Sequence, residues 1–470
     1  MTSEPKIKVA LVGGGIGGLC LAAGLVSNPR VDIHVYESVP EYKDIGAGLA
    51  LHMNAIKGMD LIGPQVKKAY FDKALTMAAE ADEEMSTKVT IAYGPNTGAL
   101  VAELGKAKGR KTVARSDLLA GLMELIPKDK LSFGKRLDSI KERDDQTIDL
   151  TFKDGTFAHA DAVIGCDGVH SITRGFLLGE DHPARAPKNN DGWQIYRTLI
   201  PAEEAKRYID EKYTRTVPIL CGPKGHVNCM PLHNMRDVSA GVAMRGARKP
   251  GMTEAPELKP EDFEGYTKEA QDIIKVSNNP LPFYPFFLHF SFVKPFTHSN
   301  QMIARDTSAS WTIMDHDHAP FYSRRRVTMM GDAAHAAMPF AGNGAAQAIE
   351  DATVINELFN NLNSASEIEA LFQAYDQIRR PRSQKVVEIA RDFGRLYGFA
   401  IPEYGDDPDK MRSFFGKNAA FTNNADLGKQ NEDAVELFKE LVAKNQGVEG
   451  GKVQEKDDLQ KVGSDVKVGA

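Results

Sequence analysis

Three glycines near the N-terminus have the spacing that binds a pyrophosphate. Residues 13–18 read Gly-Gly-Gly-Ile-Gly-Gly, so Gly13, Gly15 and Gly18 form the pattern G-x-G-x-x-G. The first glycine permits a tight turn, the second lets the backbone approach a pyrophosphate, and the third lets a helix pack closely on a strand. Glu37 follows at the distance typical of a carboxylate that accepts hydrogen bonds from a ribose. These residues predict an adenine dinucleotide, either NAD or FAD.

The segments around these glycines predict a β-α-β unit. Residues 7–12 and 31–36 are apolar or β-branched runs typical of strands, and residues 16–26 are rich in Leu and Ala. This order favours parallel strands with a right-handed crossover. The predicted helix begins at the glycines, so its unpaired N–H groups and partial positive charge can face phosphates.

Two further glycine-containing segments follow predicted strands later in the chain. Residues 165–174 follow the apolar run at 162–165, and residues 331–344 follow a run at 326–330. Asp332 then lies at the carboxyl end of a strand, where it can bond a polyol such as a ribityl chain. The sequence Gly-Asn-Gly at 342–344 opens a helix whose N–H groups can face an anion.

The three segments together resemble the fingerprints of single-component FAD-dependent aromatic monooxygenases, the para-hydroxybenzoate hydroxylase family. Residues 311–315 and 326–335 are most similar to its salicylate hydroxylase-like branch. The resemblance implies an α/β fold in the cofactor domain and an α+β arrangement for the chain as a whole. It has a Rossmann-type FAD domain with a mixed parallel sheet, a second, mostly antiparallel sheet domain for substrate, and C-terminal helices.

The resemblance also implies which residues contact FAD. Arg115 reaches the cofactor from a helix start, Asp167 and Arg174 organise the pyrophosphate side, and the N–H groups of Gly344 and Ala345 stabilise a reduced flavin. The full predicted cofactor-binding set is Gly13, Gly15, Gly18, Glu37, Ala50, Arg115, Asp167, Asp332, Gly344 and Ala345.

The chemistry implied by the resemblance is oxygen insertion into an aromatic ring. NAD(P)H reduces FAD, O2 adds at the flavin C4a, and the hydroperoxide delivers one oxygen atom to a phenol or salicylate-like substrate. A buried phenolate needs a cation or several donors to stay ionised. Arg197, on a strand predicted near residues 193–200, is the candidate catalytic and substrate-binding residue. The alternative is an exposed arginine on an edge strand.

Other residues are predicted to shape the substrate pocket. Met230 stands where some relatives pair a tyrosine with the arginine, which argues against phenol dearomatisation. Pro339 is followed by Phe340 and Ala341, where many relatives have a polar pair. We therefore expect a more apolar floor and a substrate that is larger or less polar than salicylate. The aromatic run 283–292 could line the pocket, although a sheet core explains it better.

Composition narrows the class of protein. The 470 residues predict about three domain-sized modules, and the net charge of −6 argues against a nucleic-acid binder. Four scattered cysteines without C-x-x-C spacing indicate a reducing compartment, and the many glycines in residues 9–28 argue against a membrane span. We expect a cytoplasmic monomer or homodimer that binds a small aromatic molecule and O2.

Two histidine-containing segments predict structure rather than chemistry. Residues 315–318 read Asp-His-Asp-His, but alternate residues of an extended chain face opposite sides, so we expect a polar loop and no metal. His335 falls in a structural motif of the family, which favours a packed, hydrogen-bonded histidine over a catalytic base.

The predicted boundaries interleave two domains. Residues 1–188 form the first part of the FAD-binding domain, 189–300 the substrate-binding antiparallel sheet, and 301–369 the return to the FAD domain. Helices follow over 370–445, where Pro381 is expected to kink or break a helix. Residues 446–470 contain no aromatic side chain and are predicted to be a disordered tail.

Several alternatives stay open. An NAD-dependent dehydrogenase shares the first motif but does not account for the other two, and a disulfide reductase needs a redox cysteine pair. A flavin-dependent epoxidase or ring-rearranging monooxygenase acting on an alkene, indole or terpenoid differs only in its pocket residues. A non-oxygenating FAD-binding protein would consume no NAD(P)H.

Overall fold

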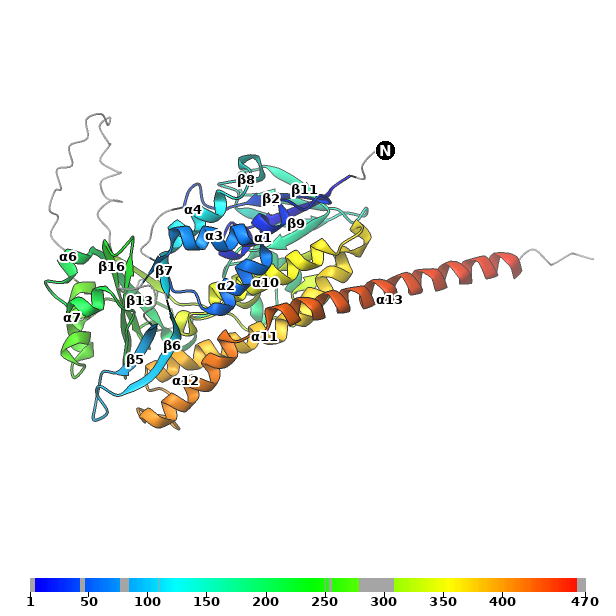
Figure 1. Cartoon of the computed structure of the whole chain (residues 1–470). Helices are drawn as coiled ribbons and strands as arrows, with labels where there is room; N and C mark the ends of the chain where they lie inside the picture. The colour runs from blue at the N-terminus through cyan, green and yellow to red at the C-terminus, as the bar shows by residue number, and fades with distance from the viewer. Residues whose placement is uncertain are drawn as a thin grey trace, which may run out of the picture.

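The structure is built around two large sheets that are joined by helices (Figure 1). The computed structural model describes residues 5–42, 47–76, 84–108, 110–249, 251–252, 256–278 and 308–462. The aromatic run predicted at 283–292 lies outside these ranges. The fold is the predicted α/β class, with a mixed parallel sheet, a mostly antiparallel sheet and C-terminal helices.

The first sheet carries the three glycine segments. Its order is β18 (Ser323–Arg324), β19 (Val327–Met329), β12 (Ala162–Gly165), β1 (Ile7–Val12), β2 (Val31–Tyr36) and β8 (Leu131–Ser132). All neighbours are parallel except β18 with β19. Because β1, β12 and β19 are adjacent and parallel, the three predicted loops leave the sheet at the same edge. The predicted β-α-β unit is confirmed, with α1 (Ile16–Leu25) as its helix.

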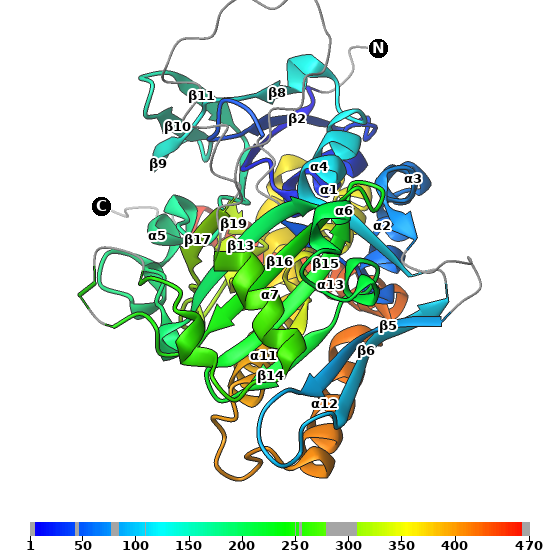
Figure 2. The ribbon, with the colours of Figure 1, turned by 90° about the vertical axis from the view of Figure 1, so that its left-hand side faces the viewer.

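The second sheet is larger than the predicted segment 189–300. Its order is β17 (Ser308–Thr312), β13 (Gln194–Pro201), β16 (Asp237–Met244), β15 (Gly225–Leu232), β14 (Ile219–Gly222), β5 (Glu84–Ile91) and β6 (Leu100–Lys108). Only β14 and β5 pair in parallel. Figure 2 shows α6 (Ala202–Ala205) and α7 (Lys268–Asn278) in front of this sheet.

The composition of this sheet corrects the predicted boundaries. Strands β5 and β6 come from the segment assigned to the first FAD part, and β17 comes from the segment assigned to the return. Strand pairing joins edges that are distant in sequence, and local patterning does not reveal which edge a strand will join.

Smaller elements complete the body. The predicted hairpin near residues 147–156 is present as β10 and β11, which pair in antiparallel fashion. The remaining strands and helices are β3 (Gly48–Leu49), β4 (Leu75–Thr76), β7 (Lys111–Ala114), β9 (Leu137–Glu142), β10 (Ile148–Phe152), β11 (Phe157–Ala160), α2 (Met53–Ile62), α3 (Pro64–Lys73), α4 (Arg115–Met123), α5 (Ile172–Leu178), α9 (Asp332–His335) and α10 (Gly344–Asn360).

The C-terminal helices differ from the prediction in two places. Helix α11 (Ile368–Tyr397) continues through Pro381, so the proline does not break it. After α12 (Pro408–Asn423), α13 (Leu427–Val462) extends away from the body in Figure 1. Residues 446–462 are therefore helical rather than a disordered tail. Their many Lys, Glu and Gln residues have good helix propensity, which does not need an aromatic core.

Candidate active site

The three glycine loops line one cavity of about 790 Å³ at the carboxyl edge of the first sheet. Its wall includes residues from the loops after β1, β2, β12 and β19, and from the start of α10. Nine of the ten predicted cofactor-binding residues lie on it: Gly13, Gly15, Gly18, Glu37, Arg115, Asp167, Asp332, Gly344 and Ala345. The structure thus brings together side chains that are more than 300 residues apart in the sequence.

The first glycine motif has the geometry of a phosphate cradle. Gly13 has φ +114°, and a Cβ at this position would lie 2.2 Å from the carbonyl oxygen of Cys166. A Cβ on Gly18 would lie 2.3 Å from the carbonyl oxygen of Gly13, so both positions require glycine for packing. A Cβ on Gly15 would meet no atom within 4 Å. Gly15 therefore leaves open space beside the N-terminus of α1, where a pyrophosphate would fit.

Glu37 connects the glycine loop to the ribose side of the cavity. Its Oε2 accepts a hydrogen bond from the N–H of Gly14 at 2.7 Å, and its Oε1 accepts one from the N–H of Val39 at 2.9 Å. A carboxylate has about four lone-pair sites, so Glu37 retains acceptor capacity for ribose hydroxyls while it fixes the loop.

Asp167 and Arg174 shape the second loop in different ways. Asp167 lines the cavity, and its Oδ2 accepts the N–H groups of Ile172 and Thr173 at 2.9 and 3.0 Å, so it holds the start of α5. Arg174 is fully buried and donates to the carbonyl oxygens of Val169, Arg185 and Ala333. It does not line the cavity. The structure therefore gives Arg174 the role of joining loops instead of the predicted cofactor role.

The end of the cavity that is expected to hold the flavin, which we call the flavin end, is formed by the loop after β19 and the start of α10. Gly331 has φ +59°, and Asp332 follows with its side chain facing the cavity. Desolvation raises the pKa of Asp332. The charges of His335, Arg115 and Arg174 act to lower it but do not outweigh the desolvation. A Cβ on Gly344 would meet no atom within 4 Å, so the N-terminus of α10 is open toward a ligand. These residues fit the ribityl chain and an anionic flavin edge.

A buried ion cluster holds this loop in place. Asp351 accepts the N–H of Gly331 at 2.8 Å and lies 2.6 Å from His335 Nε2. Arg379 of α11 bonds Glu350 and Asp351 at 2.8 Å each, and the side chains of all three are 0% exposed. Burial alone would raise the pKa of Asp351, but the charges of His335 and Arg379 outweigh it and lower the pKa. His335 is a packed, hydrogen-bonded residue, as expected.

A second cavity of about 320 Å³ lies between the flavin end and the antiparallel sheet. It shares Leu49, Asp332, Gly344 and Ala345 with the first cavity. The four predicted substrate-binding residues, Arg197, Met230, Pro339 and Phe340, all line it, and so does Ala50. Ala50 therefore lies at the substrate side of the flavin end, whereas the other predicted cofactor residues line the first cavity.

Arg197 is a cation that faces this second cavity. It lies on β13, the second strand from one edge of the sheet, which pairs on one side with β16 and on the other with β17. Its guanidinium lies 5.2 Å from the ring centre of Trp311, and burial lowers its pKa. Among the residues that the structure describes, no carboxylate forms an ion pair with Arg197. The geometry excludes the alternative of an exposed arginine on an edge strand.

Part of the wall of the second cavity is aromatic, formed by Phe340, Tyr397 and the ring of His226. The ring of Phe340 lies 4.5 Å from that of Trp193, and its carbonyl oxygen accepts a hydrogen bond from Tyr397 at 3.1 Å. Sequence reasoning missed His226, whose ring packs 5.0 Å from Tyr397. Burial lowers the pKa of His226 to about 3, so the ring is neutral at pH 7.

A signal for His226 was present in the sequence. Along β15, His226, Asn228 and Met230 are alternate residues, and all three line the second cavity. Side chains two residues apart on a strand share a face. Once Met230 is assigned to the pocket, the other two follow from this period.

The side chains of residues 315 and 316 bond other groups of the protein. Buried Asp315 bonds Arg391 at 2.5 Å and Asn190 at 2.7 Å, and His316 Nδ1 lies 2.7 Å from the carbonyl oxygen of Asp317. Within the described ranges, no group of three or more His, Cys, Asp or Glu side chains could hold a metal ion. The described helices also include none that is both long and apolar enough to cross a membrane.

Comparisons with known proteins show what the chain is similar to. A family profile described as FAD binding domain matches residues 292–390. A 6-methylsalicylate 1-monooxygenase of Aspergillus terreus is 34% identical, over 94% of this chain and 95% of its own. A salicylate hydroxylase of Pseudomonas putida is 28% identical over 90% of this chain and 93% of its own. A solved salicylate hydroxylase substrate complex has a TM-score of 0.73 at 26% identity, covering 92% of this chain and 99% of the other.

The chain belongs to the FAD-dependent monooxygenases and is an oxidoreductase of that kind. Within that class it falls in the salicylate hydroxylase-like branch. The open glycines, helix N-termini and acidic acceptors of the first cavity fit the cofactor of this class, and we call it the FAD cavity.

Proposed function

We propose that the protein uses NAD(P)H and O2 to hydroxylate a single-ring phenol that carries a carboxylate, a salicylate-like acid. The observation that carries this proposal is Arg197, a recessed cation without an acidic partner among the described residues. Such a group stabilises an anion that enters its cavity and lowers the pKa of a phenol held beside it.

The cavity dimensions and lining support a small aromatic acid. A volume of about 320 Å³ is near the lower end for ligand pockets, which favours one ring over a fused system. Met230 and Phe340 offer apolar surface in the same cavity, which suits an alkyl substituent on the ring. A 6-methylsalicylate 1-monooxygenase among the relatives supports this substrate class.

The residues of the chain divide the work. Bound FAD supplies oxygen activation. Arg197 holds the carboxylate or phenolate from the sheet side, while the aromatic wall around Phe340 excludes water. Asp332 and the N-terminus of α10 fix the flavin end on the other side. The reaction balances as one substrate, one O2, one NAD(P)H and one proton giving hydroxylated product, water and NAD(P)+.

The test is stopped-flow reduction of the enzyme-bound flavin by NADH and by NADPH. We expect salicylate and 6-methylsalicylate to accelerate reduction and to give hydroxylated product when oxygen is admitted. Benzoate is the matched control, because it has the carboxylate without the phenol; it should bind and give no hydroxylated product. Acceleration by indole or a terpenoid, with none by aromatic acids, would replace this proposal with the epoxidase alternative.

A further inference from the structure

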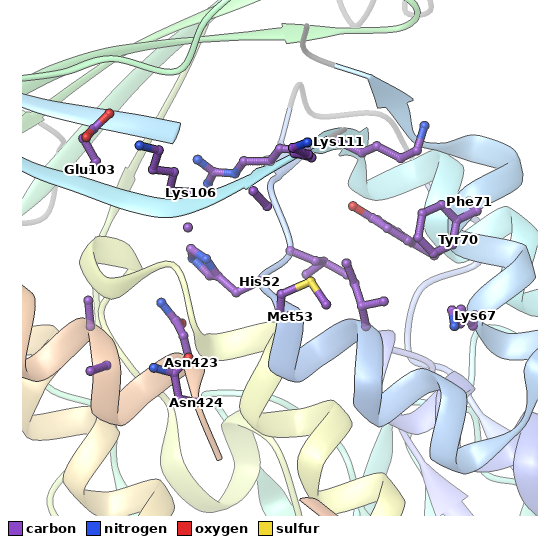
Figure 3. A pocket seen from close by; sticks show the side chains of 18 residues that line it. His52, Met53, Lys67, Tyr70, Phe71, Glu103, Lys106, Lys111, Asn423 and Asn424 are labelled. Atoms are coloured by element: carbon purple, nitrogen blue, oxygen red, sulfur yellow. The ribbon is translucent and has the colours of Figure 1, made fainter. Parts of the chain in front are cut away.

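A third cavity of about 510 Å³ lies beside the substrate cavity and outside the FAD site (Figure 3). It is bounded by β6, by α2 and α3, and by the end of α12. It shares Leu51, His52 and Arg110 with the substrate cavity. It shares none of its lining residues with the FAD cavity. We call it the outer cavity, and the substrate cavity the inner cavity.

The outer cavity is strongly basic. Its wall holds one carboxylate, that of Glu103, and five cationic side chains. The cations are Lys67, Lys106, Lys108, Arg110 and Lys111. Lys67 and Lys106 have acidic neighbours, at 3.0 and 3.4 Å. Lys108 has no acidic partner in the part of the chain that the structure describes. The excess positive charge attracts anions to this opening.

His52 and Arg110 form the wall between the two cavities. A Cβ on Gly105 would lie 2.4 Å from His52 Nδ1 and 3.1 Å from Arg110 Cζ, and a Cβ on Gly342 would lie 3.3 Å from His52 Nε2. His52 is thus held between the strand β6 and the loop before α10. Arg110 is anchored by one bond, from Nη1 to the carbonyl oxygen of Leu104 at 2.8 Å.

Three buried polar atoms at this cavity have no hydrogen-bond partner among the described residues: His52 Nδ1, Tyr70 Oη and Arg110 Nε. The side chains are only 8%, 1% and 6% exposed. Buried polar groups in proteins are almost always paired, so these three groups beside one hollow are available to bond a polar ligand. Figure 3 shows His52, Tyr70 and Lys106 around this hollow.

The remaining wall selects the kind of anion. Leu51, Met53 and Ile56 contribute apolar surface opposite the lysines. A ring can contact this surface while its carboxylate faces the cations. We propose that the outer cavity is a second binding site for the aromatic carboxylate substrate. From this site the substrate passes between His52 and Arg110 into the inner cavity. This inference rests on the proposed function.

The first test counts bound ligand on the FAD-loaded enzyme by equilibrium dialysis with labelled salicylate. We expect two salicylates per FAD in the wild type. Arg197→Met should lose the inner one and keep the outer one. Tyr70→Phe keeps the ring shape and removes only the unpaired hydroxyl, so it should weaken the outer site and leave the inner site intact. A single salicylate in the wild type would overturn the proposal.

The second test measures kinetics in Lys106→Gln/Lys108→Gln. We expect kcat/KM for salicylate to fall roughly fivefold, with kcat unchanged and weaker dependence on ionic strength. Lys88→Gln/Lys141→Gln is the matched control, because it removes the same charge from exposed positions that line none of the three cavities. Equal effects in the two variants would mean general electrostatics and would overturn the proposal.

The same assay separates the possible ligands. The KM for NADH and NADPH should be unchanged in Lys106→Gln/Lys108→Gln; an increase there, with salicylate unaffected, would assign the cavity to the nicotinamide nucleotide and overturn the proposal. If the wild type binds two salicylates but turns neither over, the proposed function fails while the second site stands.

Discussion

Replacing Arg197 by methionine is the sharpest test of the inner cavity. Two unit charges 4 Å apart interact by about 4 kcal/mol at an effective dielectric constant of about 20. The cavity is partly open, and solvent reduces this value by roughly a quarter to a half, to about 2–3 kcal/mol. Because each 1.36 kcal/mol corresponds to a factor of ten, we expect kcat/KM for a salicylate-like acid to fall about 30- to 150-fold. Methionine keeps the apolar contact with Trp311, so the sheet should fold normally.

The assay compares kcat/KM for salicylate with FAD content and with turnover of an uncharged phenol. FAD content should be unchanged, because Arg197 does not line the FAD cavity. Arg324→Met is the matched control, since Arg324 also lies over an aromatic ring, Phe176, at 5.0 Å but lines none of the three cavities. Near-normal kinetics for salicylate in Arg197→Met would refute the assignment of an anionic substrate group to this arginine.

Four further substitutions and one pH experiment test the rest of the site. Gly15→Val should reduce FAD affinity by more than about tenfold while the apoprotein melts normally, because its side chain enters the open phosphate space; Gly13→Val should lower the melting temperature of the apoprotein, because its Cβ meets a backbone carbonyl at 2.2 Å. Asp332→Ala should weaken FAD binding about tenfold with an unchanged far-UV spectrum, and wild-type retention of FAD would contradict the ribityl contact. Arg379→Met should cost about 3 kcal/mol of stability, because Glu350 and Asp351 lose a buried counterion and keep only Arg382 and His335 as partners. Since the folded pKa of Asp351 is lowered, its contribution is present above the unfolded value near 3.8 and is lost as pH falls through the folded value, so wild-type melting temperature should drop below about pH 4.

The FAD site was largely predictable from local sequence. Gly13, Gly15 and Gly18 are recognised by spacing because a tight turn, a phosphate contact and a helix-strand contact each need glycine at a fixed place. Asp332 could be placed because it follows a short apolar run that reads as a buried strand. In each case the chemistry depends on residues that are close in sequence.

The remaining features depend on contacts that sequence patterns do not encode. Arg174 has the sequence position of a cofactor residue, but a turn 11 residues further on supplies the carbonyl oxygen of Arg185 that captures it. The outer cavity forms where β6, α3 and α12 meet. No local pattern shows that β6, from the segment assigned to the FAD domain, joins the second sheet. Pro381 was expected to kink or break a helix, and it does not break α11, which continues through it while packed against α10 and α13.

A crystal structure of the enzyme with FAD and salicylate would show both ligands against the residues assigned to them. We expect a pyrophosphate over Gly15, the flavin ring between Gly344 and the inner cavity, and a carboxylate or phenolate oxygen within about 3 Å of the guanidinium of Arg197. A flavin bound away from the three glycine loops, or a salicylate that leaves Arg197 without an anionic partner, would contradict this expectation.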